Sequence, residues 1–81
     1  MWNTISDCDK QLTIHSRVRE KVDDSFLVYE IIGVEYDLYK LELINRDNRP
    51  VPEVIHNVLD CNQLIQYHFE VEDKVTAAEK E

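Results

Sequence analysis

Hydrophobic and polar residues alternate between positions 12 and 22, and this period of two predicts a half-buried β-strand. The inward side of this strand is mostly apolar and consists of Leu12, Ile14, Ser16, Val18, Glu20 and Val22. The outward side is polar and mostly basic and consists of Thr13, His15, Arg17, Arg19 and Lys21. Two aspartates follow at positions 23 and 24, where they favour a turn because their side chains can bond to the nearby backbone.

Residues 26–38 ("FLVYEIIGVEYDL") are dense in β-branched and aromatic residues, which favours a second, longer strand. Its apolar residues fall on both parities, as expected of a strand that bends or is covered on both faces. Gly33, the only glycine of the chain, indicates a bulge or bend in its middle. Residues 39–45 alternate again with Tyr39, Leu41 and Leu43 inward, and should pair antiparallel with the long strand through a tight turn at residues 36–38.

The second half of the chain begins with a loop at residues 45–50, after which Pro50 and Pro52 allow only an edge strand over residues 51–55. Asp60 followed by Gln63 is a capping-box pattern, which predicts a short helix at this point. Residues 67–72 then close the domain as a last strand. We expect residues 1–10 to be loosely ordered, residues 11–72 to form a single domain, and residues 73–81 to form a solvated acidic tail.

This order of elements predicts a mainly β fold: a small antiparallel barrel of about five strands with one short helix before the last strand. The segments "VYEIIGVE", "YKLELI" and "PEVIHNVLDCNQLIQYHF" resemble those of small phage-encoded proteins with an SH3-like barrel. The resemblance covers residues 12–71 and implies that fold and a role in host takeover or in the inhibition of host defence. The only tryptophan, Trp2, lies outside the expected barrel, so binding of proline-rich peptides is not implied. The alternative fold is an α+β sheet with one packed helix.

The charge of the chain bears on its partners. Among 81 residues, 17 Asp and Glu oppose 9 Lys and Arg, which gives a net charge of -8. Nucleic-acid binding draws its affinity from neutralised phosphates, so we expect no direct contact with nucleic acid. A strongly acidic chain instead suits a basic protein surface, because complementary fields speed the encounter of two proteins. Solubility alone is the competing explanation for such a charge.

Catalytic and metal-binding signals are weak. Cys8 and Cys61 fit no zinc spacing and are too few for a disulfide framework, so we expect reduced cysteines in a cytoplasmic protein. No apolar run suggests a membrane span or a secretory signal. His15, His56 and His68 are not spaced as metal ligands. Glycine-dependent catalytic motifs are missing too, so we expect a protein that is not an enzyme and that needs no metal or cofactor.

The candidate site is the acidic and aromatic surface of the central hairpin. Its partner-binding residues are expected to be Glu30, Glu35, Tyr36, Asp37, Tyr39 and Glu42. Cross-strand geometry would gather several of these carboxylates on one rigid face. The basic side chains of residues 13–21 are expected to face acids on the neighbouring strand, which would leave the remaining surface more uniformly negative. A free basic patch that contacts a phosphate or an acidic partner is the alternative.

These features favour a non-enzymatic acidic protein that occupies a basic, nucleic-acid-binding surface of a larger protein, such as a nuclease, and inhibits it. Phage inhibitors of host defence nucleases, including anti-CRISPR proteins, are the class that the resemblance implies. The alternative is a structural or adaptor module that forms homo-oligomers or docks into a larger complex through an exposed edge strand. An antitoxin-like neutraliser of a basic toxin would use the same physics.

Overall fold

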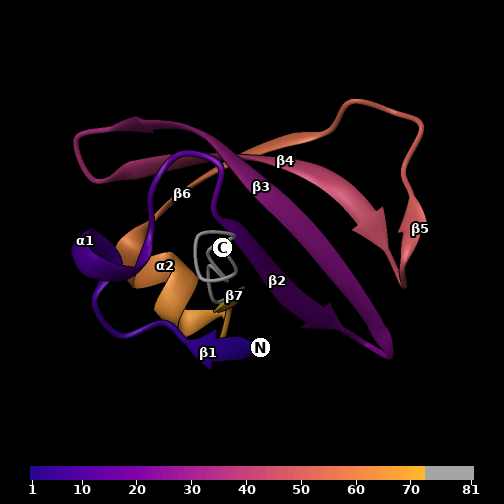
Figure 1. Cartoon of the computed structure of the whole chain (residues 1–81), viewed down its shortest axis with the longest axis horizontal. Coiled ribbons are helices and arrows are strands. Elements are labelled where there is room, and N and C mark those ends of the chain that lie inside the picture. The colour runs from indigo at the N-terminus through magenta and orange to yellow at the C-terminus, as the bar shows by residue number, and fades with distance from the viewer. Residues whose placement is uncertain (73–81) are drawn as a thin grey trace, which may run out of the picture.

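The computed structural model describes residues 1–72, which fold into one antiparallel sheet with two short helices (Figure 1). The elements in chain order are β1 (Trp2–Thr4), α1 (Cys8–Gln11), β2 (Arg17–Val22), β3 (Ser25–Glu35), β4 (Leu38–Arg46), β5 (Arg49–Pro50), β6 (His56–Asp60), α2 (Cys61–Gln66) and β7 (Glu70–Glu72). The expected mainly β class is confirmed. No helix within this part of the chain is long and apolar enough to cross a membrane.

The sheet is open, so the expected barrel does not close. Its strand order is β1-β7-β2-β3-β4-β5, and β6 pairs with the half of β4 that β5 leaves free. All the pairings are antiparallel. The short closing strand β7 explains the open form, because it lies between β1 and β2 and does not reach β6. One edge of the sheet is therefore β1, and the other is made by β5 and β6.

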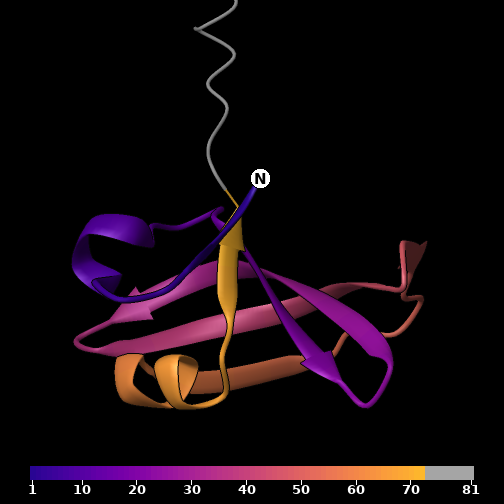
Figure 2. The ribbon, with the colours of Figure 1, turned by 90° about the horizontal axis from the view of Figure 1, so that it is seen from below.

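The core lies on one face of this sheet. Tyr39, Leu41 and Leu43 of β4 are buried, as their alternation predicts, and they meet Tyr29 and Ile31 of β3. Leu64 of α2 and Phe69 belong to the same cluster, which also includes Ile5, Cys8, Leu12, Val18 and Val71. Helices α1 and α2 both lie at the end of the molecule where β3 turns into β4 (Figures 1 and 2). That end is therefore the thicker part of the domain.

Local signals predicted the central hairpin and α2 correctly. Glu35 pairs with Leu38, so only Tyr36 and Asp37 form the turn between β3 and β4. The register of the hairpin shifts between Ile31 and Gly33, which confirms a bulge beside the only glycine. The Asp60 side chain accepts from the Gln63 N–H at 2.8 Å, and the Gln63 side chain accepts from the Asp60 N–H at 3.0 Å. This is the predicted capping box, and it fixes the start of α2.

The N-terminal segment differs from the expected loose order. Residues 2–4 form β1, which pairs with β7, and α1 places Cys8 in the core. Ile5 is also buried. The expectation of reduced cysteines is wrong, because Cys8 and Cys61 form a disulfide that joins α1 to α2 across a sequence separation of 53. Residues 1–11 therefore belong to the folded domain.

Two other boundaries also differ. The strand expected over residues 12–22 begins only at Arg17, because residues 13–16 form a turn in which the Thr13 N–H donates to the Ser16 hydroxyl. The edge strand lies at residues 56–60, beyond the segment flanked by the prolines, where every residue keeps the N–H that pairing requires. The acidic tail expected at residues 73–81 lies outside the described residues.

Candidate interaction surface

The turn between β3 and β4 presents the most exposed aromatic residue of the described chain. Tyr36 is 92% exposed and has a φ of 58°, in the left-handed region. Glycine, asparagine or aspartate normally occupies such a position in a two-residue hairpin turn, because a bulky side chain is strained there. Glu35 and Asp37 flank Tyr36, and both are exposed. We call these three residues the hairpin tip.

Two further carboxylates lie next to the hairpin tip. Asp7 and Asp9, from the start of α1, line a hollow of about 260 Å³ together with Asp37 and both half-cystines. Tyr39 lines the same hollow. The pKa of its phenol is raised, mainly by burial and to a smaller extent by the negative charges of Asp9, Asp37 and Asp7. The three carboxylates therefore gather around one hollow. The hairpin tip with Asp7 and Asp9 is called the acidic end below.

An apolar hollow borders the acidic end on the other face of the hairpin. It has a volume of about 320 Å³ and is lined by Gly33, Val34, Glu35, Leu38, Lys40 and Val58. Gly33 stands opposite Lys40 in the register and contributes no side chain, which leaves the space open. Val34, Leu38 and Val58 are each more than 40% exposed. An apolar surface between charged groups is the composition expected of a protein contact.

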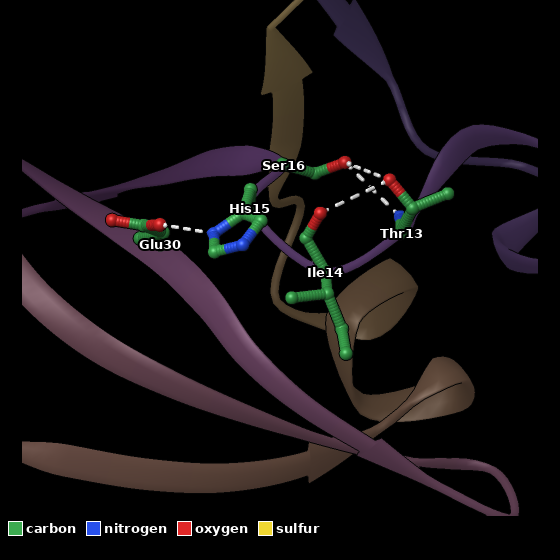
Figure 3. Close-up of polar contacts among 5 residues, drawn as sticks. All are labelled: Thr13, Ile14, His15, Ser16 and Glu30. Atoms are coloured by element: carbon green, nitrogen blue, oxygen red, sulfur yellow. Dashed lines mark hydrogen bonds and ion pairs between the residues drawn. The ribbon is translucent and has the colours of Figure 1, made fainter.

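Glu30 and Glu42 occupy a different place, in the middle of the hairpin. They are direct cross-strand partners, as the predicted gathering of carboxylates requires. Both have basic neighbours within the chain: His15 Nδ1 lies 2.9 Å from Glu30 Oε2, and His56 Nε2 lies 4.0 Å from Glu42 Oε1 (Figure 3 shows the first pair). These carboxylates are therefore less available to a partner than those of the hairpin tip.

The basic side chains of residues 13–21 face acids only in part, because Lys21 lies opposite Phe26. Arg17 lies opposite Glu30 in the register, and Arg19 Nε forms an ion pair with Glu70 Oε1 at 2.8 Å. The Arg19 guanidinium also stacks on Trp2 and Phe26, at 4.7 and 4.5 Å from the two ring centroids. This cation is held by its own chain and does not form a free basic patch.

The six residues expected to contact a partner therefore divide into three groups. Glu35, Tyr36 and Asp37 lie together at the exposed hairpin tip. Glu30 and Glu42 lie about 16 Å away along the strand, given ~3.3 Å per residue, with Lys40 between them and the tip. Tyr39 is only 4% exposed, so its expected role as a contact is wrong; its inward parity beside Leu41 already placed it in the core. Asp7 and Asp9 were missed, because no local signal places α1 beside the hairpin.

Within residues 1–72, no group of three or more His, Cys, Asp and Glu side chains is arranged to hold a metal ion. Comparisons of the chain with protein-family models, with curated proteins and with solved structures find no match. Any functional conclusion therefore depends on the geometry of the acidic end itself.

Proposed function

We propose that the protein is a non-enzymatic binding protein that occupies a basic, nucleic-acid-binding surface of a larger protein and inhibits it. The proposal depends on one observation. Tyr36 projects from a strained turn between two exposed carboxylates, with Asp7 and Asp9 nearby. Backbone strain at an exposed position is found where function requires a particular presentation. Tyrosine is also among the residues most enriched at binding hot spots.

The mechanism is competition with nucleic acid. Within residues 1–72, Glu35 and Asp37 form no ion pair, so their charges are available to the cations of a partner. The same partner cations would otherwise neutralise phosphates. Tyr36 supplies contact area at the centre, and the exposed apolar residues beside Gly33 exclude water from the rim. The net charge of -8 speeds the encounter at low salt.

The likeness to small phage-encoded SH3-like proteins remains part of this proposal, and with it the class of host defence nucleases as targets. So does a cytoplasmic location. The disulfide between Cys8 and Cys61 weighs against that location, since disulfides persist mainly in oxidising compartments. Thiol labelling of the protein in its native cells would decide the question, because free thiols at both positions are expected in a reducing cytoplasm.

The experiment compares two charge reversals of equal size. Glu35→Lys with Asp37→Lys alters the hairpin tip, and Asp23→Lys with Asp24→Lys alters the turn between β2 and β3 by the same net charge. Immobilised wild-type protein is exposed to an extract of the cells that encode it, at low and high salt. The captured protein is then purified, and its binding to labelled DNA is measured with each variant as competitor.

We expect wild-type protein and the control variant to displace the DNA. We expect the tip variant to require at least about tenfold more protein, which corresponds to ~1.4 kcal/mol. Added salt should slow the association of the complex. Equal losses in both variants would mean that only net charge matters. A captured protein that keeps its DNA in the presence of wild type would contradict the proposal.

The alternative function, a structural or adaptor module, has one observation in its favour, an edge of β6 with which no strand of residues 1–72 pairs. A loosely held Trp2 would also suit such a module as an anchor, but this residue is not loosely held. Trp2 is part of β1 and stacks on Arg19 of the same chain.

A further inference from the structure

Strand β6 has an unprotected open edge. It pairs with β4 on one side, and within residues 1–72 no other strand pairs with it. His56, Asn57 and Val58 are exposed. Natural proteins usually protect such edges with lysine, proline, a bulge or a very short strand. The β5 edge contains Pro50 and the β1 edge has three residues, whereas the register of β6 runs without a shift through five residues that include no lysine or proline.

The backbone groups that face this edge can be assigned from one hydrogen bond. The Leu43 N–H donates to the Ile55 carbonyl at 2.9 Å, so Ile55 directs its backbone groups toward β4. Residues of an antiparallel strand alternate in this respect. Asn57 and Leu59 therefore also face β4, while His56 and Val58 direct their N–H and C=O groups toward the open side, and the start of α2 uses those of Asp60.

We infer that a second copy of this chain pairs with this edge, β6 against β6, about a two-fold axis at Val58. In this antiparallel register Val58 faces Val58, and His56 faces Asp60 of the other copy. Val58 directs its backbone groups outward, so the central pair falls where the ladder forms hydrogen bonds. The Asp60 N–H is already bonded to the Gln63 side chain, and the Asp60 C=O accepts the first backbone bond of α2, so the ladder bonds between the copies are the two between Val58 and Val58.

The side chains of β6 also match their own copy in this register. Val58 is 54% exposed and would pack on its equivalent across the axis. The imidazole of His56 would lie opposite the carboxylate of Asp60, a pairing that forms a hydrogen bond in either charge state of the ring. A partner strand from another protein would have to provide this pattern by chance, whereas the two-fold axis provides it automatically.

The dimer should be weak, and its salt dependence distinguishes it from the proposed inhibitory complex. A five-residue strand pair lies at the small end of protein interfaces, below ~1,200 Å². Each copy carries a net charge of -8, so the two copies repel, and salt that screens this repulsion should strengthen the dimer. Binding to a basic partner weakens with salt. Failure of one proposal therefore leaves the other open to test.

The experiment is sedimentation equilibrium of the full chain, from micromolar to millimolar concentration, at low and high salt. We expect the mass to rise from 9.6 kDa toward twice that value, and to rise further at high salt. Val58→Pro removes the N–H that faces the open edge and no bond to β4, so it should leave a folded monomer. Val58→Lys keeps the backbone and places like charges opposite each other, so it should also be monomeric.

The matched control is Val22→Lys, which adds the same charge on β2, a strand separated from β6 by β3 and β4. This variant should dimerise at least as well as wild type does when both are compared at high salt. Circular dichroism establishes that each variant is folded, and Val58→Lys serves alone if Val58→Pro does not fold. A wild-type protein that stays monomeric at millimolar concentration and high salt overturns the inference, as does a dimer that persists in Val58→Lys.

Discussion

The two ends of the β3–β4 hairpin are built in opposite ways. At the acidic end, the turn places Tyr36 at a φ of 58°, and within residues 1–72 its side chain forms no hydrogen bond. At the other end, the turn after β4 has Asp47 and Asn48 at φ values of 52° and 66°, which suits these residues. Asp47 there accepts from the Phe26 N–H and donates its own N–H to the Phe26 carbonyl.

The two turns therefore differ in whether local backbone preference explains their residues. The Asp47 turn satisfies local preference and ties β4 to β3, so stability alone explains it. The Tyr36 turn works against local preference and shows no compensating bond within the described chain. Such a conflict is expected at a functional position. Four changes test this contrast, beginning with the bond that holds the acidic end together.

Loss of the disulfide should have the largest effect. Cys8→Ala with Cys61→Ala removes a cross-link over a separation of 53 residues, which lowers the free energy of unfolding by about 4 kcal/mol in the chain-entropy account. A domain of 81 residues has only ~4–12 kcal/mol in total. We therefore expect a partly or wholly unfolded variant in urea titrations monitored by circular dichroism.

The same loss should follow when the wild-type protein is reduced with dithiothreitol. An unfolding midpoint that is identical with and without reductant would show that α1 is held by its packing alone. The disulfide would then not contribute to the difference in stability between the two ends of the hairpin.

Replacing Asp47 should have the next largest effect. Asp47→Ala removes the acceptor of the Phe26 N–H, so the thermal midpoint should fall by several degrees, measured by calorimetry. Asp47→Asn is the matched control, because it keeps an acceptor and tolerates the left-handed backbone. It should retain most of the stability.

The Asp47 effect should also depend on pH. Two hydrogen bonds lower the pKa of the Asp47 carboxyl. The bond from the Phe26 backbone has the larger effect, and the bond with the Ser25 side chain has the smaller one. A lowered folded-state pKa stabilises the protein above the unfolded-state value, ~3.9, and this contribution is lost as the pH falls through the folded-state pKa. Wild type and Asp47→Ala should therefore converge in strongly acidic solution. A constant difference at all pH values would contradict the assignment.

Tyr36→Gly should have a smaller effect of the opposite sign. Glycine relieves ~1–2 kcal/mol of left-handed strain and costs ~0.5–1 kcal/mol of backbone entropy. The variant should therefore be more stable by roughly 0.5–1 kcal/mol in urea titrations, while it loses at least tenfold in the DNA-displacement assay. Asn48→Gly, at the other end, should leave displacement unchanged. A Tyr36→Gly protein that is less stable, or that binds as well as wild type, would remove the reason to call this turn functional.

The sequence predicted the elements that depend on neighbours along the chain. Alternation located β4 and its buried Tyr39, Leu41 and Leu43, and the Asp60–Gln63 pattern located α2. These signals are local, because adjacent residues specify the same face or the same helix start. The turn at Tyr36 was also located correctly, although no turn-forming pair of residues marks it.

The parts that the sequence missed depend on distant partners. β1 pairs with β7, some seventy residues away, and Cys8 bonds to Cys61. The residues near position 8 contain no local pattern that predicts either contact. This is why Asp7 and Asp9 were not included in the candidate site. The hairpin carboxylates were expected to form one face, but Glu30 and Glu42 lie farther along the strands than the tip, and Lys40 lies between them and the tip.

Glu20 provides the smallest and most specific test, because it is an acid on the core face of the sheet, away from the hairpin tip. It lies beside half-buried Leu27 on the core face of β2, and burial raises the pKa of its carboxyl. Burial raises the pKa of the Tyr29 phenol, and the negative charge of Glu20 raises it further. A carboxyl with a raised folded-state pKa loses stability as the pH rises from its unfolded-state value, ~4.3, through the folded-state value.

Glu20→Gln should therefore stabilise the protein at neutral pH by at most about 0.5 kcal/mol, and the gain should vanish near pH ~3, as urea titrations at both pH values would measure. The same variant should displace DNA as well as wild type does, whereas Glu35→Gln, which removes the same charge from the hairpin tip, should displace it less well. Equal effects of the two variants on displacement would mean that the partner senses only the total charge. The two ends of the hairpin would then differ in stability and not in function.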